Sequence, residues 1–379
     1  MPSTPSRRTL LRTGALGLGI LLGAAAPGNA LATGPLPPFG RYGGPHRRLT
    51  PRTLYVDPAG RGDHTTVQAA VTAAGPGHTL VLAPATYRET VVVPAGHTGL
   101  TLLGASGDPR DTVIVYGNAA GTPKPDGSGT YGTSGSATTT VLADGFTAHR
   151  VTFANDFLRA DHPGITATQA VALKATGDRS AFLHCRFLGH QDTLYADTAA
   201  LPVFARQYFA HCYAEGDVDF VFGRATAVFE HCRFHTLARD VDFTPKGMVF
   251  APSTAVANPH GHLAVGCRIT SGAEDGAYKL ARPWVPSSDP TARPSLVVRD
   301  SLLGPGIDAA APYANMREQY PWQAQRFAEY RNSGPGARIL DPAERPQLTR
   351  AEAAAATREA YLGDWRPWAA RGAAEHRLP

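Results

Sequence analysis

A short strand pattern recurs in the middle of the chain and constrains its fold more than any other feature. Each copy alternates a residue that suits a core, one that suits solvent and another that suits a core, and successive copies lie 20 to 35 residues apart. Strands at this period, with turns and no helical pattern between them, predict an all-β chain wound as a parallel β-helix. A β-sandwich would show similar local alternation, but the small residue at matching positions favours the β-helix. The copies are Val151-Thr152-Phe153, Cys185-Arg186-Phe187, Cys212-Tyr213-Ala214, Cys232-Arg233-Phe234 and Cys267-Arg268-Ile269.

The first 32 residues carry the pattern of an export signal and are set apart from the fold. Ser6-Arg7-Arg8-Thr9-Leu10-Leu11 is a twin-arginine pattern, residues 14–26 are apolar, and Ala30-Leu31-Ala32 is a small-x-small cleavage site. The apolar stretch is too short and too rich in glycine to span a membrane comfortably. We therefore expect a signal peptide over 1–32 with cleavage after Ala32, a flexible segment over 33–50, one domain over 51–379, and a secreted product without a membrane segment.

Composition supports this interpretation and excludes one class of partner. The 379 residues include 40 Gly and 32 Pro, and only 18% are charged, which suits many short strands joined by turns. The predicted signal peptide holds three of the 36 basic residues and none of the 31 acidic ones, so the mature net charge falls from +5 to +2. A nearly neutral chain with interspersed charges gives no electrostatic case for binding nucleic acid.

Two aspartates occupy matching positions in the repeat. Asp192 follows Cys185 by seven residues, and Asp219 follows Cys212 by seven. If the cysteines stack on adjacent coils, the two carboxylates face each other across strands about 4.8 Å apart. Like charges at that separation are costly unless one binds a proton or a cation lies between them, so such a pair indicates a functional site. The alternative, two unrelated aspartates that cap turns, does not explain the shared register.

Polar side chains near this pair suit the chemistry of an ester carbonyl. Gln191 precedes the first aspartate, Gln169 stands at a similar strand position one coil earlier, and Arg282 with Trp284 lies further along the chain. Amide N–H groups stabilise a developing oxyanion, and a guanidinium holds a carboxylate ionised. The sequence contains no G-x-S-x-G motif for a serine nucleophile and no carboxylate cluster for calcium, so we expect no metal and no other cofactor.

These segments together resemble the pectinesterase family of carbohydrate esterases. The resemblance runs from Tyr55 to about Trp368, and it includes residues 85–89, 132–138, the strands around both aspartates and their amides, 280–284 and 326–337. Six motifs in the family's order make the resemblance specific. The family usually has Gly where Ala281 and Ala85 stand, so an added methyl before Arg282 could change how closely substrate approaches.

The resemblance implies a fold and an activity. The fold is a single-stranded right-handed parallel β-helix of the pectin lyase-like type with a long shallow cleft. The activity is hydrolysis of the methyl esters of galacturonate in pectin, which gives pectate and methanol, so methyl-esterified pectin is the expected partner of a monomeric enzyme. The resemblance assigns Asp219 as nucleophile, Asp192 as general acid and then base, Gln169 and Gln191 as oxyanion donors, Arg282 as the partner of Asp219, and Trp284 as a wall that contacts the sugar.

Three aromatic side chains and one threonine complete the candidate site. Tyr195, Phe222 and Trp284 could line the cleft because flat rings pack on sugar faces, although core packing explains strand aromatics equally well. Thr133, in the Gly- and Ser-rich segment, is a further candidate for substrate binding.

Other functions remain open on the sequence alone. A β-helix glycosidase or lyase that cuts the pectin backbone would also use paired acids. A β-helix that only binds polysaccharide would need the aromatic residues but not the acids, amides and arginine together. The same mechanism could also act on another ester, such as a thioester or an acetylated sugar.

The cysteines and the histidines that precede them allow further expectations. Cys212 and Cys232 lie on adjacent predicted coils, and the family resemblance supports a disulfide between them, with stacked free thiols as the alternative. His184, His211 and His231 each precede a cysteine and should point outward as a surface column, which does not form a closed metal site.

The C-terminal region has a helical pattern. Residues 349–361 are rich in alanine, with Thr349 at the N-cap and Glu at the third helical position. We expect a helix here that packs on the coils or caps them.

Overall fold

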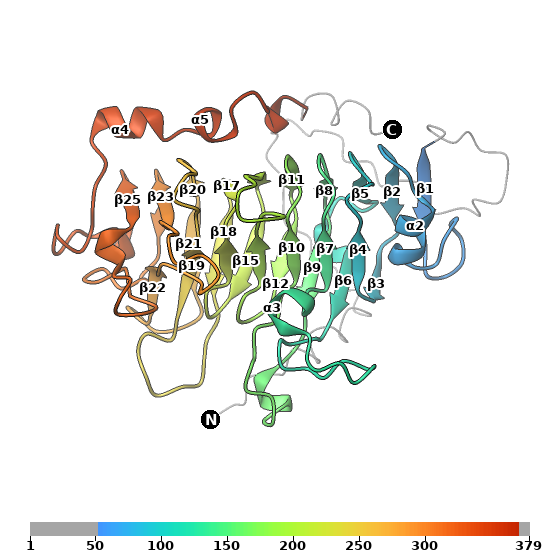
Figure 1. Cartoon of the computed structure of the whole chain (residues 1–379), viewed down its shortest axis with the longest axis horizontal. Coiled ribbons are helices and arrows are strands. Elements are labelled where there is room, and N and C mark those ends of the chain that lie inside the picture. Colours follow the sequence, from blue (N-terminus) through green and yellow to red (C-terminus); the bar gives the residue numbers. More distant parts are fainter. Residues whose placement is uncertain (1–51, 371–379) are drawn as a thin grey trace, which may run out of the picture. The chain divides into compact units, whose positions relative to one another are not determined.

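Each coil of the chain consists of three short strands, one in each of three parallel sheets. The protein's structure is a computed structural model that describes residues 52–370. After a strand of the first sheet (sheet A), the chain enters the second (sheet B), then the third (sheet C), and then returns to sheet A one rung further on. Figure 1 shows the rungs in chain order from β1 to β25. The structure confirms the predicted parallel β-helix.

The strands of the three sheets are in register, so equivalent residues of successive coils stack. Sheet A contains β1 (Thr53–Val56), β2 (Thr79–Leu82), β5 (Thr101–Gly104), β8 (Thr147–His149), β11 (Ser180–Leu183), β14 (Arg206–Ala210), β17 (Thr226–Glu230), β20 (His262–Val265), β23 (Ser295–Arg299) and β25 (Arg326–Tyr330). Sheet B contains β3 (Ala85–Arg88), β6 (Thr112–Tyr116), β9 (Thr152–Asn155), β12 (Arg186–Leu188), β15 (Tyr213–Gly216), β18 (Arg233–Thr236), β21 (Arg268–Ser271) and β24 (Leu302–Leu303). Sheet C contains β4 (Val91–Val93), β7 (Thr139–Val141), β10 (Leu173–Ala175), β13 (Leu194–Ala196), β16 (Val221–Gly223), β19 (Gly247–Pro252) and β22 (Tyr278–Ala281).

The core consists of inward side chains stacked from coil to coil. In sheet A, Phe182, Phe209 and Phe229 stack with ring centroids 4.9 and 4.8 Å apart. Each buried side chain of this size contributes about 1.5–3 kcal/mol to folding. The four cysteines extend the same core beside sheet B, as their inward positions in the repeat predicted.

The cysteines do not form the disulfide predicted between Cys212 and Cys232. All four are free and buried in the structure. Each thiol instead lies near a backbone carbonyl of the preceding coil, at 3.3 Å from the Phe182 oxygen for Cys212 and 3.4 Å from the Phe209 oxygen for Cys232. In an in-register parallel pair the Cα–Cβ bonds point the same way, whereas a disulfide prefers a dihedral near 90° between its two ends. Stacking as thiols avoids that distortion.

The corners between sheets are sharp turns that need left-handed backbone. At the corner from sheet A to sheet B, His184, His211 and His231 have φ of 53°, 52° and 53°. Their rings stack with centroids 5.1 and 5.4 Å apart, which is the predicted outward column. Asp192 (φ 64°) and Asp219 (φ 50°) occupy the corner from sheet B to sheet C. Aspartate tolerates this conformation better than most residues do, because its short side chain bonds locally.

A helix packs on the first coils. Helix α2 (Val67–Ala73) buries Val67, Ala70 and Val71 against the core. The carboxylate of Glu89 accepts hydrogen bonds of 2.8 Å from the backbone N–H groups of Val67 and Gln68, where the helix dipole favours a negative charge. The role of Glu89, in the family-like segment 85–89, is therefore structural.

The C-terminal helix predicted over 349–361 is two helices. Helix α4 (Arg350–Ala355) has the expected capping box between Thr349 and Glu352, and Thr357 caps a separate helix, α5 (Arg358–Leu362). The side chains of α5 pack on the outer face of sheet A against residues such as Tyr208 and Val228. Figure 1 shows the ribbon of α5 beside β17. This segment therefore covers a side of the coils. The remaining elements are α3 (Gly132–Gly135), η1 (Pro109–Asp111), η2 (Arg159–Asp161), η3 (Trp322–Ala324), η4 (Pro335–Ala337) and η5 (Pro367–Ala370).

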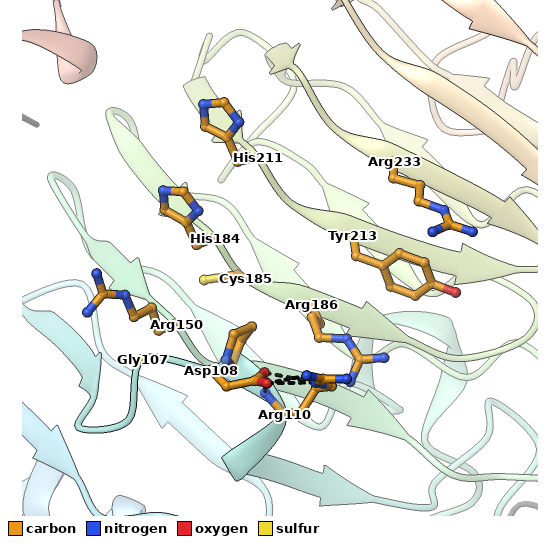
Figure 2. A pocket seen from close by; sticks show the side chains of 11 residues that line it. Gly107, Asp108, Arg110, Arg150, His184, Cys185, Arg186, His211, Tyr213 and Arg233 are labelled. Carbon is orange, nitrogen blue, oxygen red and sulfur yellow. Dashed lines mark hydrogen bonds and ion pairs between the residues drawn. The ribbon is translucent and has the colours of Figure 1, made fainter. Parts of the chain in front are cut away.

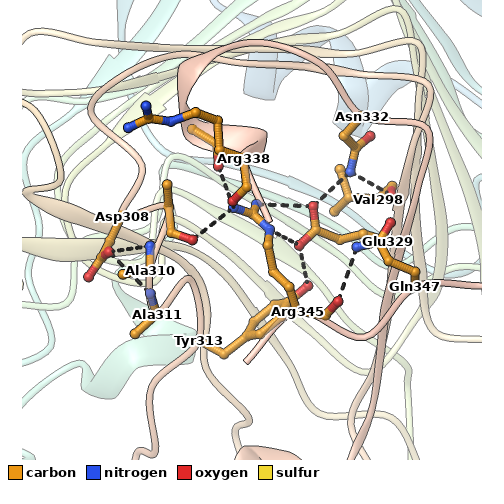
Figure 3. A network of polar contacts seen from close by, with 12 residues as sticks. Val298, Asp308, Ala310, Ala311, Tyr313, Glu329, Asn332, Arg338, Arg345 and Gln347 are labelled. Atoms are coloured by element: carbon orange, nitrogen blue, oxygen red, sulfur yellow. Dashed lines mark hydrogen bonds and ion pairs between the residues drawn. The ribbon is translucent and has the colours of Figure 1, made fainter. Parts of the chain in front are cut away.

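A buried ion pair anchors the segment that leads to these helices. Glu329 of β25 accepts from Arg345, and both side chains are 1% exposed. Figure 3 shows the surrounding network, in which Tyr313 and Asn332 also donate to Glu329 while three backbone carbonyls accept from the guanidinium.

The N-terminal predictions fall outside this structure. The proposed signal peptide over 1–32 and the segment over 33–50 precede the first described residue. Between residues 52 and 370 no helix combines the length and the apolar character that crossing a membrane requires.

Candidate active site

Asp192 and Asp219 stand on adjacent coils with their side chains in register. Strands β13 and β16 pair Leu194 with Val221, and each aspartate precedes its residue of this pair by two positions, so the two aspartates occupy equivalent corners. The Asp192 N–H donates to the Val218 carbonyl at 3.0 Å, which continues the ladder up to the corner. The predicted stacking is confirmed: the two carboxyl groups lie on neighbouring rungs, about 4.8 Å apart at the backbone.

The two aspartates differ in their partners although both are nearly buried, with 8% and 6% of their surface exposed. Arg282, just after β22, donates from Nε to Asp219 Oδ1 at 2.9 Å and from Nη2 to Oδ2 at 2.6 Å. Within the described residues, no hydrogen bond reaches the carboxyl group of Asp192. One acid is thus held in a bidentate ion pair, and the other is left to meet a molecule that enters the site.

The environment separates the proton affinities of the pair. Burial raises the pKa of Asp219, and the positive charge and hydrogen bonds of Arg282 oppose that rise. Burial and the negative charge of Asp219 together raise the pKa of Asp192 well above its ordinary value, with Arg282 opposing. The proton of a singly protonated pair therefore belongs on Asp192, which leaves Asp219 as the anion.

A cavity of about 340 Å³ opens over the pair and collects all nine predicted site residues. They come from segments between α3 and the loop after β22, so the winding of the coils assembles them from distant parts of the chain. Met316 is part of the same wall and carried no sequence signal, being alone in an irregular loop. The lining residues are Thr133, Ser134, Gln169, Gln191, Asp192, Tyr195, Asp219, Phe222, Ala251, Arg282, Trp284 and Met316.

A chain of hydrogen bonds fixes the orientation of the Gln191 amide. Arg159 Nε donates to the Thr168 hydroxyl at 3.3 Å, and the hydroxyl lies 2.9 Å from Gln191 Oε1. Because arginine can only donate, the hydroxyl hydrogen is left for the amide oxygen. The NH₂ group of Gln191 must then face away from Thr168. Gln191 also lines the cavity. Neither Thr168 nor Arg159 was predicted from the sequence.

The anchor of this chain is a buried acid outside the catalytic pair. Asp217 accepts from Arg159 at 2.6 and 2.7 Å and lies 3.1 Å from His190 Nδ1. Burial alone would raise the pKa of Asp217, but the bonds from Arg159 and His190 outweigh burial and hold that pKa well below its ordinary value. His190 and Asp217 are 27 residues apart, the same offset as Asp192 and Asp219, so the register argument could have found them.

The aromatic candidates divide into a floor and a wall. Tyr195 and Phe222 stack with centroids 4.1 Å apart and are only 6% and 3% exposed, so they form the floor of the cavity. Trp284 is partly exposed and meets Phe222 at 5.6 Å, while Arg224 lies 5.4 Å from its ring. Of the three rings, Trp284 presents the most surface to a ligand.

Ala281 does not have the effect expected from its departure from the family pattern. Its side chain is fully buried in the core, and β22 pairs it with Phe250. Alternation along the strand places the methyl group on the inner face and Arg282 on the outer face. The extra methyl therefore belongs to core packing and does not project towards the cavity.

Comparisons with known proteins agree with this geometry. The pectinesterase family model matches residues 53–368. The chain is 34% identical over 313 residues to a pectinesterase of Ralstonia solanacearum, covering 73% of this chain and 78% of that protein. It is also 34% identical over 250 residues to pectinesterase 31 of Arabidopsis thaliana, covering 62% and 71%.

Solved structures extend the likeness to three dimensions. The pectin methylesterase PemA from Erwinia chrysanthemi superimposes with a TM-score of 0.72 at 29% identity, covering 83% of this chain and 97% of that one. A crystal structure of a pectin methylesterase in complex with a hexasaccharide gives a TM-score of 0.73 with the same identity and coverage.

Proposed function

The chain belongs to the pectinesterase family, and from that membership we propose that it hydrolyses galacturonate methyl esters in pectin with Asp219 as nucleophile and Asp192 as general acid and base. Members of this family are carboxylic ester hydrolases, and one similar structure holds a hexasaccharide. The observation that carries the assignment of roles is the asymmetry of the pair, because Arg282 binds Asp219 and no described group bonds to the carboxyl of Asp192.

In the first half of the reaction, a carboxylate oxygen of Asp219 attacks the ester carbonyl carbon. The carbonyl electrons move onto oxygen, and the C–O bond to the methoxy group then breaks. Asp192 supplies the proton that the leaving methoxide needs, and methanol departs. The galacturonyl group remains joined to Asp219 as an acyl-enzyme anhydride, and Asp192 is now a carboxylate.

In the second half, water replaces the leaving alcohol. Asp192 accepts a proton from a water molecule, which attacks the galacturonyl carbon of the anhydride. Asp219 leaves as a carboxylate, and its pairing with Arg282 favours that charge. This step leaves Asp192 protonated and Asp219 ionised, which is the starting state of the pair, and the galacturonic acid product loses its proton to solvent to become galacturonate.

The two amides are suited to the negative charge that develops on the carbonyl oxygen. Gln191 and Gln169 line the cavity beside the aspartates, and the Thr168 bond turns the Gln191 NH₂ group away from the loop. Donors held in place before the reaction cost no reorganisation in the transition state, which makes them effective. Trp284 is the proposed wall for a sugar ring, and Thr133 is a further proposed contact in the lining of the same cavity.

The assignment is tested by methanol release from highly methylated pectin. The parent should release methanol, and Asp219→Asn should lose activity by a factor of about 10⁴ or more, as loss of a nucleophile does elsewhere. Asp300→Asn is a matched control, because Asp300 also has φ 50° at a corner and pairs with an arginine, but lies outside the cavity. Activity retained in folded Asp219→Asn would refute the nucleophile, and viscosity loss without methanol would indicate backbone cleavage.

The same proposal extends to export and organisation. Residues 1–32 would direct twin-arginine export with cleavage after Ala32, and residues 51–379 would form the catalytic domain of a secreted monomer. The intact mass of the exported protein tests the cleavage site, and its elution volume in gel filtration tests the monomer. A mass that includes residues 1–32 would contradict the signal peptide.

A further inference from the structure

A second cavity, of about 570 Å³, lies away from the catalytic pair and is rich in arginine. Figure 2 shows its side chains, which come from the loop before β6, the corner between sheets A and B, and the outer face of sheet B. It shares no lining residue with the catalytic cavity. With the histidines neutral, its charged groups sum to +3, because Arg110, Arg150, Arg186 and Arg233 face a single acid, Asp108.

We call this second cavity, lined by Arg110, Arg150, Arg186 and Arg233, the arginine groove. Its one acid is already neutralised. Asp108 accepts from Arg110 Nε at 2.8 and 3.0 Å, so this pair contributes no net charge. Among residues 52–370, no carboxylate lies within ion-pair distance of Arg150, Arg186 or Arg233. Burial lowers the pKa of Arg186, and this effect, together with the positive charge of Arg110, outweighs the opposing influence of Tyr213 and Asp108. Folding disfavours a partly buried guanidinium that has no paired carboxylate, so an arginine of this kind indicates a role beyond the fold.

Two of these arginines are held in a defined arrangement. The register of sheet B places Arg186, Tyr213 and Arg233 on three successive rungs of its outer face. The guanidinium groups lie 5.2 and 5.8 Å from the centroid of the Tyr213 ring, within the range of cation–π attraction. The tyrosine hydroxyl donates to Glu215 at 2.7 Å, which fixes the ring. The cations therefore lie two rungs apart, about 10 Å at the backbone.

We propose that the arginine groove binds demethylated polygalacturonate, the carboxylate polymer that the catalytic site produces. This inference rests on the proposed function. A single small anion would need donors that converge on one point, whereas these cations stand on separate rungs along the axis of the coils. An extended uronate chain carries its carboxylates in such a row, at a spacing that alternate sugars can match. A bound product stretch retains the enzyme on the polymer as demethylation proceeds.

The test compares three double variants in binding to a demethylated oligogalacturonate of about ten sugars, an extended chain long enough to cross the rungs. Arg186→Gln/Arg233→Gln should weaken binding about tenfold at low salt, the upper end for two partly exposed charge pairs. Arg338→Gln/Arg350→Gln removes the same charge from two exposed positions outside the groove and should change binding less than about twofold. Arg186→Lys/Arg233→Lys keeps the charge and should restore most of the affinity.

Methanol release separates the groove from the catalytic cavity. On highly methylated pectin the glutamine variant should match the parent, whereas on partly demethylated pectin its KM should rise and its kcat should not. An equal loss of binding in Arg186→Gln/Arg233→Gln and Arg338→Gln/Arg350→Gln would overturn the proposal. A fall in activity of Arg186→Gln/Arg233→Gln on highly methylated pectin that parallels its fall in binding would also overturn it. If the parent releases no methanol, the proposed function fails, but oligogalacturonate binding still reports on the groove.

Discussion

Among the buried carboxylates that residues 52–370 pair with arginine, Glu329 and Asp219 are held in opposite ways. In the pair of Glu329 and Arg345, the carboxylate accepts from three side chains and the guanidinium donates to three backbone carbonyls as well. In the pair of Asp219 and Arg282, the carboxylate has the arginine as its side-chain partner and a second acid on the next rung. The hydrogen-bonding capacity of the Glu329 carboxylate is therefore filled, whereas the Asp219 carboxylate can still accept further hydrogen bonds.

The difference separates a structural role from a chemical one. A buried ion pair is tolerated when additional hydrogen bonds satisfy its remaining groups, as at Glu329. A nucleophile needs lone pairs that are free to attack, so its site must leave some hydrogen-bonding capacity of the carboxylate unused. At Asp219 the charge and hydrogen bonds of Arg282 favour the anion. The protein can accommodate that arrangement because the acid on the next rung takes up the proton.

Replacing Arg282 or Arg345 with methionine should distinguish the chemical role of one pair from the structural role of the other. In Arg282→Met, burial is no longer opposed, so the pKa of Asp219 rises and its anion becomes scarce. We expect kcat/KM to fall by a factor of about 10³ or more near neutral pH, comparable with the loss of a preorganised electrostatic partner. Because Asp219 can protonate instead of remaining an unpaired charge, stability should change little. A pH–rate profile should show the acidic limb moved to higher pH.

In Arg345→Met the order of the effects should reverse. Glu329 is only 1% exposed, and Arg345 is the cation paired with it, so removal of Arg345 leaves an uncompensated buried carboxylate and should cost about 3–5 kcal/mol of unfolding free energy, measured by urea denaturation. The folded fraction should release methanol at the parental rate. Replacing both residues, as in Glu329→Leu/Arg345→Met, should recover much of the loss. An active-site defect in folded Arg345→Met would show that the two pairs are coupled and that the division of roles is wrong.

Gln191 and the hydroxyl that orients it offer a finer measure of preorganisation. Gln191→Ala should lower kcat by a factor of about 10² to 10³, because one oxyanion donor is lost. Thr168→Val keeps the volume and removes only the hydrogen bond, so we expect a loss of about tenfold in kcat, equivalent to one neutral hydrogen bond, with KM unchanged. If Thr168→Val changes KM and not kcat, the chain from Arg159 serves binding and does not orient the amide.

The sequence could predict whatever depends on the repeat. The repeat sets which residues of successive coils are aligned, and this alignment alone predicted that Asp192 lies beside Asp219. The same 27-residue offset could have predicted that His190 lies beside Asp217. The segment that turns Gln191 lies in the loop around Arg159, where nothing repeats, so its contacts follow from packing in three dimensions. The same holds for Arg345, whose partner Glu329 lies across a turn with no pattern in common.

Two predictions failed for local reasons. The disulfide was predicted from the adjacent coils of Cys212 and Cys232 and from the family resemblance, but adjacency in a parallel ladder does not supply the dihedral that a disulfide prefers. The helix over 349–361 divides because Thr357 starts a second cap within an alanine-rich run that otherwise favours continuation. In both cases the sequence located the feature correctly, as stacked cysteines and as a helical segment, and the backbone geometry determined its final form.

The smallest expected effect is a gain in stability when the second acid is removed. The pKa of Asp192 is raised by folding, so its contribution to stability is complete below its unfolded value of about 3.9 and is lost as pH rises through its folded value. Asparagine does not ionise, and we therefore expect Asp192→Asn to be inactive but more stable than the parent at neutral pH, by about 0.5–2 kcal/mol, with no gain near pH 3.

Asp217→Asn should change the stability at neutral pH in the opposite direction. Folding lowers the pKa of Asp217, so its contribution is present above its unfolded value and is lost as pH falls. This variant should therefore be less stable than the parent at neutral pH and should approach it in acid. Thermal unfolding of both variants across the pH range measures the two curves. If Asp192→Asn is also destabilised at neutral pH, the Asp192 carboxyl has a stabilising role in the fold, and the contrast between a saturated and an unsaturated site does not hold.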